Sequence, residues 1–189
     1  VNIDTAAPAA STLTAAVGAL TATSVTPASL LPGNTGNATV ALTTVSPVAA
    51  NGAIKVTFPA AFTVSSGATT AVTTATGFTA GTVTISGQSV TVVTTTAIGS
   101  ATAVSFVLSN IKTPTATGSG GTYSIQTLQT DGTTVIDQQA AVTASTIATG
   151  ALASSTVTPV SLVAGASGNV TVVATTVNAV PAGGTVKVT

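Results

Sequence analysis

Few side chains in this chain of 189 residues could carry acid–base or nucleophilic chemistry. It has one Tyr and no His, Cys, Glu or Arg. A Ser–His–Asp or Cys–His arrangement is therefore impossible, and zinc or iron sites lack their usual ligands. The sequence thus predicts a protein that is not an enzyme and that holds no cofactor or metal ion. Its charged side chains are Lys55, Lys112, Lys187, Asp4, Asp131 and Asp137.

The aspartates do not form an obvious carboxylate pair. Asp131 and Asp137 flank an expected hairpin, so turn geometry and an exposed strand end account for them better than catalysis does. A calcium site needs clustered carboxylates, for which Asp4 and Asp137 are the only candidates. A catalytic Ser–Lys pair remains an alternative. Lys55, however, is expected on the outer face of a strand, as a solvated charge.

Two Asn-x-Thr sequons, at Asn37 and Asn169, are the candidate N-glycosylation sites. The first follows a glycine-rich turn at 32–36, where an exposed Asn is expected. In a chain this rich in Thr the triplet also arises by chance. Modification requires a eukaryotic or archaeal secretory route. The abundant Thr and Ser would suit O-linked glycans as well.

The two sequons are equivalent because the chain repeats itself. Residues 18–57 align without a gap with residues 150–189, at an offset of 132, and 22 of the 40 aligned positions are identical. This predicts a complete module at 18–149, preceded at 1–17 by the last strand of another module plus a linker. Residues 150–189 are then the incomplete first part of the next module.

That incomplete part is expected to hold about three strands with one exposed apolar face. Such a sheet should not be stable alone. We therefore expect either that the chain continues or that a neighbouring chain supplies the missing sheet by strand addition.

The composition limits which kinds of binding partner can be expected. Only 3% of the residues are charged and the net charge is zero, against about a quarter charged in ordinary globular chains. Without a basic patch, nucleic acid is not an expected partner. The mean hydropathy is +0.68, but Thr and Ser interrupt every apolar run, so no membrane span is expected. A surface this poor in charge needs hydration from another source, and bound sugar would supply it.

Abundant Val and Thr, punctuated by Gly, Pro, Asn and Ser, predict an all-β fold. Two hairpins are expected, at Ser86–Ser89 and at Asp131-Gly132, the latter with a type I′ turn. The expected strands are 20–26, 37–45, 53–58, 61–65, 69–75, 81–86, 89–95, 102–109, 122–130, 133–138 and 141–147.

Alternation along these strands predicts which side chains face the core. Ile54, Val56 and Phe58 share one face, while Lys55 and Thr57 point the other way. The other expected inward residues are Val83, Ile85, Val90, Val92, Val104, Phe106, Leu108, Tyr123 and Ile125. Many short strands with polar outer faces are typical of a two-sheet antiparallel β-sandwich. A β-solenoid would need a period of about 20 residues, and only the long period is found.

Several segments resemble immunoglobulin-like tandem modules of secreted surface proteins. They are the TP-x-SL opening at 26–30, the G-N-x-T-V strand at 36–40, the GxxKVTFPAAF segment at 52–62, and the Tyr-containing strand before Asp-Gly. The cysteine pair and core tryptophan of true immunoglobulin domains are absent. The resemblance implies antiparallel immunoglobulin-like β-sandwich modules in tandem, at the cell surface or outside the cell.

The expected function is structural. We expect a segment of an extracellular fibre or cell-surface filament that associates with itself end to end as a homopolymer and carries covalent glycans. One alternative is the stalk of an adhesin whose binding tip lies outside these residues. Another is a Thr-rich binder of ice or carbohydrate surfaces, suggested by Thr-x-Thr patterns such as Thr82/Thr84, although alternating outward Thr on ordinary strands explains these patterns more simply.

Overall fold

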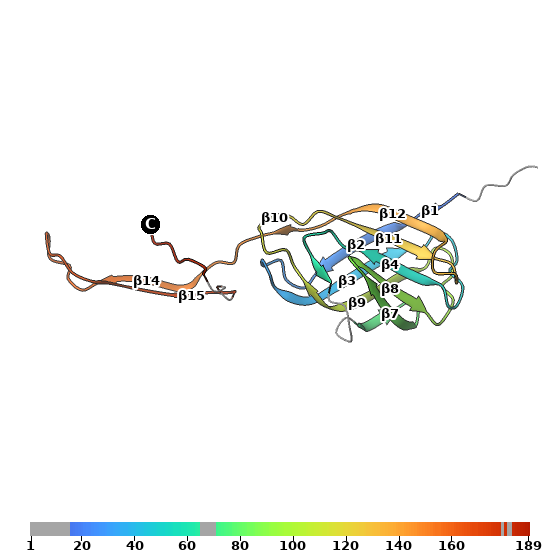
Figure 1. Ribbon diagram of the computed structural model, residues 1–189, viewed down its shortest axis with the longest axis horizontal. Helices are drawn as coiled ribbons and strands as arrows, with labels where there is room; N and C mark the ends of the chain where they lie inside the picture. The colour runs from blue at the N-terminus through green and yellow to red at the C-terminus, as the bar shows by residue number, and fades with distance from the viewer. Residues whose placement is uncertain (1–15, 65–70, 179, 181–182) are drawn as a thin grey trace, which may run out of the picture.

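The computed structural model describes residues 16–64, 71–178, 180 and 183–189. Every regular element in these residues is a β-strand and none is a helix, so the prediction of an all-β fold is confirmed. Figure 1 shows strands β1 to β13 gathered into one body, with strands β14 and β15 extending beyond it as a ribbon. We call residues 18–149 the two-sheet body.

The larger sheet of this body has six strands in the order β1-β12-β11-β4-β8-β7. All its pairs are antiparallel except β1 with β12, where Gly18 lies opposite Asp137 in a parallel pair. The expectation of a wholly antiparallel fold is therefore wrong at this edge. The strand bounds are Gly18–Ala19 (β1), Val135–Thr143 (β12), Thr122–Leu128 (β11), Ala53–Thr57 (β4), Ser89–Thr94 (β8) and Ala80–Ser86 (β7).

The second sheet has the order β2-β3-β9-β5, and β6 also pairs with β9. Its strands are Thr21–Pro27 (β2), Thr35–Thr43 (β3), Ala103–Lys112 (β9), Thr63–Val64 (β5) and Val72–Thr76 (β6). A separate two-residue pair joins β10 (Gly118–Ser119) to β13 (Thr146–Ile147).

The core lies between the two sheets and follows the alternation of each strand. In β4, Ile54 and Val56 are fully buried, while Lys55 and Thr57 are half-buried on the other face. Val40 and Phe106, opposite each other in the second sheet, belong to the same core cluster. The predicted inward faces are confirmed. Burial of these aliphatic and aromatic side chains, about 1.5–3 kcal/mol each, is the main stabilising contribution.

The aromatic side chains gather inside this core. The rings of Phe58, Phe62 and Tyr123 lie with centroids 5.4 to 5.9 Å apart. Phe78 and Phe106 form a T-shaped pair at 5.7 Å. The chain has four Phe, one Tyr and no Trp. All five aromatic side chains are buried in the core, so none of them forms a surface binding platform.

The two predicted hairpins have different outcomes. Ser86 and Ser89 pair directly across a two-residue turn, with Gly87 at φ 56°, as predicted. At the other hairpin, positive φ falls on Gly132 (70°) and not on Asp131, so a type I′ turn is wrong. The Asp131 carboxylate accepts hydrogen bonds from the amides of residues 133 and 134, and this Asx-type arrangement favours a longer loop.

After this loop the strand β12 runs without a break across the gap between the predicted strands 133–138 and 141–147, and the end of the second predicted strand falls in β13. The pairing of β12 with β11 continues through two register shifts, between Tyr123 and Ile125 and between Thr127 and Leu128. β-Bulges of this kind absorb the polar run of β12 without ending the strand.

The ribbon beyond the two-sheet body is a hairpin of β14 (Ala153–Pro159) and β15 (Val170–Thr175). We call it the second hairpin, and β2–β3 the first hairpin. Val157 pairs with Val172 in the second hairpin just as Val25 pairs with Val40 in the first, at the repeat offset of 132. The described part of 150–189 thus holds two strands, not the three expected.

The match between the two hairpins extends to irregular positions. Both have a register shift in their first strand, and there a non-glycine residue takes positive φ: Ala22 at 47° and Ser154 at 51°. Asn51 (67°) and the aligned Gly183 (81°) also both have positive φ, although the second is a glycine. Left-handed conformations are uncommon for residues other than glycine, so their recurrence shows that the repeated sequence forms the same local backbone twice.

Candidate functional site

Both sequon asparagines are accessible. Asn37 lies on the outer face of β3 and Asn169 directly precedes β15, and both are exposed. The main-chain oxygen of Asn37 accepts a hydrogen bond from the Ala28 amide at 2.8 Å, and that of Asn169 accepts one from the Val160 amide at 3.0 Å. The backbone is therefore held in the same way at both sites. The side chains remain available, as attachment of a glycan requires.

Asp131 sits exposed at the tip of the β11–β12 loop. Its carboxylate accepts a hydrogen bond from the Thr134 hydroxyl, as well as from the backbone amides of Thr133 and Thr134. These hydrogen bonds lower the pKa of Asp131 to about 2, and the bond from the Thr134 hydroxyl has the largest effect. All of these partners belong to its own loop, so Asp131 acts as a turn-forming residue, as the sequence indicates.

The structure corrects the prediction for Asp137. The sequence suggests an exposed strand end, but Asp137 is fully buried. Its Oδ2 accepts hydrogen bonds from the amides of Val45 and Ser46 at 3.0 and 2.9 Å. Its own amide donates to the Thr127 hydroxyl at 3.0 Å. The carboxylate therefore fastens β12 of one sheet to the turn that follows β3 of the other.

The other oxygen of Asp137, Oδ1, has no hydrogen-bond partner among the described residues. A Cβ on Gly18 would lie 2.1 Å from this oxygen, so only glycine fits opposite the carboxylate. Asp4, the other residue considered for a calcium site, lies outside the described residues. Among the residues that the structure describes, no group of three or more His, Cys, Asp or Glu could hold a metal ion.

The lysines lie apart from one another. Lys55 is half-buried on the outer face of β4, between Gln126 of β11 and Thr91 of β8 in the register of the sheet. Lys112 ends β9, and Lys187 is exposed beyond the second hairpin. Lys55 thus points away from the core, as predicted.

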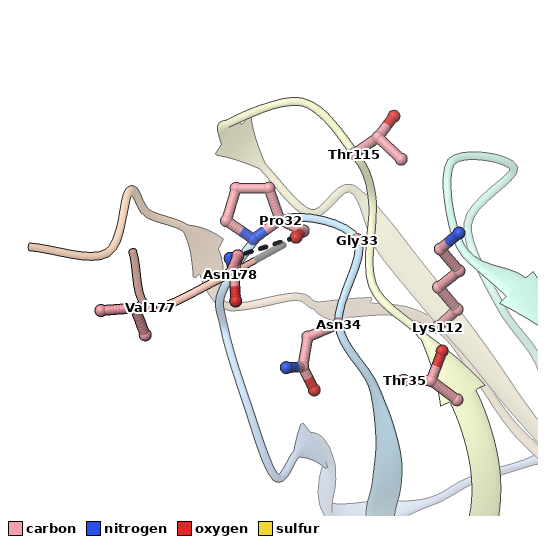
Figure 2. A pocket seen from close by; sticks show the side chains of 8 residues that line it. All are labelled: Pro32, Gly33, Asn34, Thr35, Lys112, Thr115, Val177 and Asn178. Atoms are coloured by element: carbon pink, nitrogen blue, oxygen red, sulfur yellow. Dashed lines mark hydrogen bonds between the residues drawn. The ribbon is translucent and has the colours of Figure 1, made fainter. Parts of the chain in front are cut away.

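A cleft of about 560 Å³ separates the two-sheet body from the segment that follows β15. Figure 2 shows the carboxamide of Asn178 pointing toward Pro32, and its Nδ2 donates a hydrogen bond to the Pro32 carbonyl oxygen at 3.3 Å. Lys112 is the one charged residue in the lining, so the cleft offers no acid–base pair. The lining residues are Pro32, Gly33, Asn34, Thr35, Lys112, Thr115, Val177 and Asn178.

This region is a joint between consecutive segments of the chain. A Cβ on Gly150 would lie 3.1 Å from Val177 Cβ and 3.2 Å from Leu31 Cδ2, so the loop of the first hairpin approaches the start of the second. Sequence reasoning missed Asn178 because the aligned residue in the first copy is Ser46. The substitution gave no clear signal, because neighbouring aligned positions also differ, such as Pro47 and Ala179.

Tyr123 is the remaining group with a perturbed ionisation. It is fully buried, and its hydroxyl has no hydrogen-bond partner among the described residues. Burial raises the pKa of Tyr123 to about 12, because the phenolate would lose its hydration. A phenol held neutral inside the core serves packing and offers no reactive anion.

No helix in the described part of the chain is long and apolar enough to cross a membrane. Comparisons with protein-family models, with curated proteins and with solved structures find no match to this chain.

Proposed function

We propose that this chain is a structural segment of an extracellular fibre or cell-surface filament built from tandem immunoglobulin-like β-sandwich repeats, with glycans on Asn37 and Asn169. One observation carries the proposal: the same hairpin geometry occurs twice, 132 residues apart, with an exposed sequon at the same place in each copy. Recurrence of one supersecondary unit at a fixed long period is the signature of a repeat array.

The strand order supports an immunoglobulin-like sandwich. Immunoglobulin constant-type domains have strands A, B, E and D in one sheet and C, F and G in the other. If β2, β3, β4, β5, β9, β11 and β12 are taken as A to G in that order, the observed sheets are A-B-E-D and C-F-G. The β7–β8 hairpin, inserted between D and E, extends the six-stranded sheet, which holds C, F and G, beyond C.

Two side chains of β11 bear on this proposed strand assignment. Tyr123, at the start of β11, corresponds in sequence position to the tyrosine of the tyrosine corner near the start of strand F, but among the described residues its hydroxyl lacks the backbone hydrogen bond that defines that corner. Ile125, two residues later, stands where the second cysteine of an antibody domain would be. The hydrophobic core of this body therefore takes over the role of the inter-sheet disulfide, in agreement with a chain that has no Cys.

The low charge and the small polar residues of the surface favour a fibre that is hydrated but uncharged. With 3% charged residues, ion pairing contributes little to cohesion or solubility. The outer face of β3 presents Thr35, Asn37 and Thr39, which are small polar residues that permit close lateral packing or carry sugar. An extracellular location is part of this proposal, and the low charge and the absence of Cys are compatible with it.

The Thr-rich ice- or carbohydrate-binding alternative gains no support. Thr82 and Thr84 lie on β7 of the six-stranded sheet, whereas Thr21 and Thr23 lie on β2 of the other sheet. These threonines therefore do not form one flat rank, and the twist of a sheet opposes such an array.

The experiment is electron microscopy of the native material, combined with intact-mass analysis. We expect filaments or a surface layer and a mass above that of the bare polypeptide, which is 17.7 kDa for these 189 residues. Asn37→Gln should remove one glycan, and Asn34→Gln, a nearby Asn outside a sequon, is the matched control. A monodisperse monomer that never occurs in filaments or layers would contradict the structural role, and a bare mass would contradict glycosylation.

A further inference from the structure

The second hairpin leaves exposed the same apolar face that the first hairpin buries. Val25 and Val40 are 4% and 0% exposed, whereas the aligned Val157 and Val172 are 58% and 44% exposed. The contrast continues along the alignment: Leu20, Val48, Ile54 and Val56 are at most 3% exposed, whereas Leu152, Val180, Val186 and Val188 are 49% to 73% exposed.

One edge of the second hairpin is also unpaired. In the two-sheet body, β3 pairs with β2 on one side and with β9 on the other. Among the described residues, β15 pairs with β14 alone. Its other edge is the one that β9 occupies along β3. An open edge beside an exposed apolar face is a template for strand addition.

The residues of the second hairpin are suited to the same neighbours. Ala38 and Leu42 face the core from β3, and the aligned residues are Val170 and Ala174. One position gains volume and the other loses it, so the face stays apolar at similar total volume, the kind of exchange that cores tolerate best. The outward Thr39 is retained as Thr171.

We propose that the apolar face of the second hairpin is an acceptor surface for a further copy of residues 58–149 of this repeat. The strand of that copy equivalent to β9 pairs with the free edge of β15. By the register of β3 with β9, Val172 lies opposite Phe106 of the copy and Val170 lies opposite its Leu108. This inference rests on the proposed tandem organisation and names what completes each unit of it.

Charge gives no reason to expect another kind of partner. The second hairpin, 153–175, contains no Lys, Arg, Asp or Glu, so it offers nothing that would steer an acidic or basic partner to this face. The competing occupant is a second hairpin from another molecule, and the experiment below separates the two.

The test uses a polypeptide of residues 1–189 followed directly by a copy of residues 58–149. The register continues because Thr189 aligns with Thr57. Hydrogen exchange of the β15 amides should slow by at least about 100-fold relative to the 189-residue chain, and binding of a hydrophobic dye should fall. Val172→Lys in the fused chain should abolish this protection, while Thr171→Lys, on the outward face, should leave it intact.

Cysteine pairs test the register, since the chain has no Cys of its own. Thr39 and Val107 are partners in β3 and β9, so Thr39→Cys with Val107→Cys sets the reference yield of disulfide. Thr171→Cys with Val107→Cys in the appended copy should reach a similar yield. Thr171→Cys with Ala103→Cys in the appended copy, which is out of register, should not.

Three results would overturn the proposal. One is unchanged β15 exchange in the fused chain, whether or not the appended copy folds. Another is a higher yield for the out-of-register cysteine pair. The third is concentration-dependent protection of β15 in the 189-residue chain itself, because the occupant would then be another hairpin. None of these depends on filaments, so a covered hairpin in a protein that never forms filaments would refute the proposed function alone.

Discussion

The first and second hairpins have the same pairing, the same register shift and a left-handed residue at the same aligned position, yet one lies in a core and the other is exposed. The difference teaches that the short-range sequence is sufficient to set the hairpin geometry, whereas burial depends on strands that come from elsewhere. Isolated two-stranded ribbons are marginally stable at best. The first hairpin, in contrast, pairs with β9 and contributes Val25 and Val40 to the core cluster that it shares with the other sheet.

A charge placed at matched positions of the two hairpins should have the largest difference in effect. Val40→Asp puts a carboxylate into the core with no cation nearby and should cost more than about 4 kcal/mol, enough to unfold the two-sheet body. Val172→Asp should change the free energy of unfolding of the two-sheet body by less than about 0.5 kcal/mol, because Val172 is already solvated. Urea unfolding of both variants measures the difference, and equal effects would contradict the account.

The turn that follows each hairpin offers a second contrast. Asp137 holds the amides of Val45 and Ser46, so Asp137→Ala leaves two inward-facing N–H groups without partners and should cost about 2–3 kcal/mol. Asp137→Asn keeps an acceptor oxygen and should cost less than about 1 kcal/mol. At the aligned turn, Asn178→Ala removes one contact to Pro32 and should leave the unfolding midpoint in urea unchanged. A large loss of stability in Asn178→Ala would show that the contact with Pro32 contributes substantially to the fold, contrary to this account.

The aligned glycines Gly18 and Gly150 have different surroundings. Gly18→Ala places a methyl group against Asp137 Oδ1 and should cost about 2 kcal/mol. Gly150→Ala meets the side chains of Val177 and Leu31 at the joint, which can shift, and should cost less than about 1 kcal/mol. Thermal unfolding of the two variants gives the order directly, and the reverse order would show that the joint is the more tightly packed site.

The smallest effects concern Tyr123, a core residue of strand β11. Removing its unpaired hydroxyl in Tyr123→Phe should leave stability unchanged or raise it by up to about 1 kcal/mol. Because burial raises the pKa of Tyr123 from 10.0 to about 12, the native state holds the proton more tightly than the unfolded state. Stability should therefore be constant below pH 10 and fall as the pH rises toward 12.

With a single Tyr and no Trp, absorbance near 295 nm follows this one phenol. It should titrate near pH 12 in the native chain and near pH 10 in denaturant. A native titration near pH 10 would show that the hydroxyl is solvated. Tyr123→Phe should abolish the signal and serves as the control.

Much of the fold could be predicted because alternation is a local signal. The inward faces of β4, β8, β9 and β11 follow directly from residues such as Ile54, Val90 and Phe106. The Ser86–Ser89 hairpin follows from a glycine placed where positive φ is needed. These features depend on residues close together in the sequence.

The predictions that failed concern long-range contacts or turn chemistry. The burial of Asp137 depends on amides more than 90 residues away in the sequence, and an aspartate near a turn gives no sign of that. The type I′ turn failed because the Asp131 carboxylate bonds to the loop that follows it. The joint contact of Asn178 with Pro32 joins residues 146 positions apart, which no local pattern encodes.

The most direct measurement of the central claim is hydrogen exchange, resolved by residue, on the 189-residue chain at several concentrations. We expect the amides of β3 around Val40 to exchange only through global unfolding, and those of β15 around Val172 to exchange at least about 1,000-fold faster. Equal protection of the two strands, independent of concentration, would mean that the second hairpin already has a core within this chain, and would contradict the account.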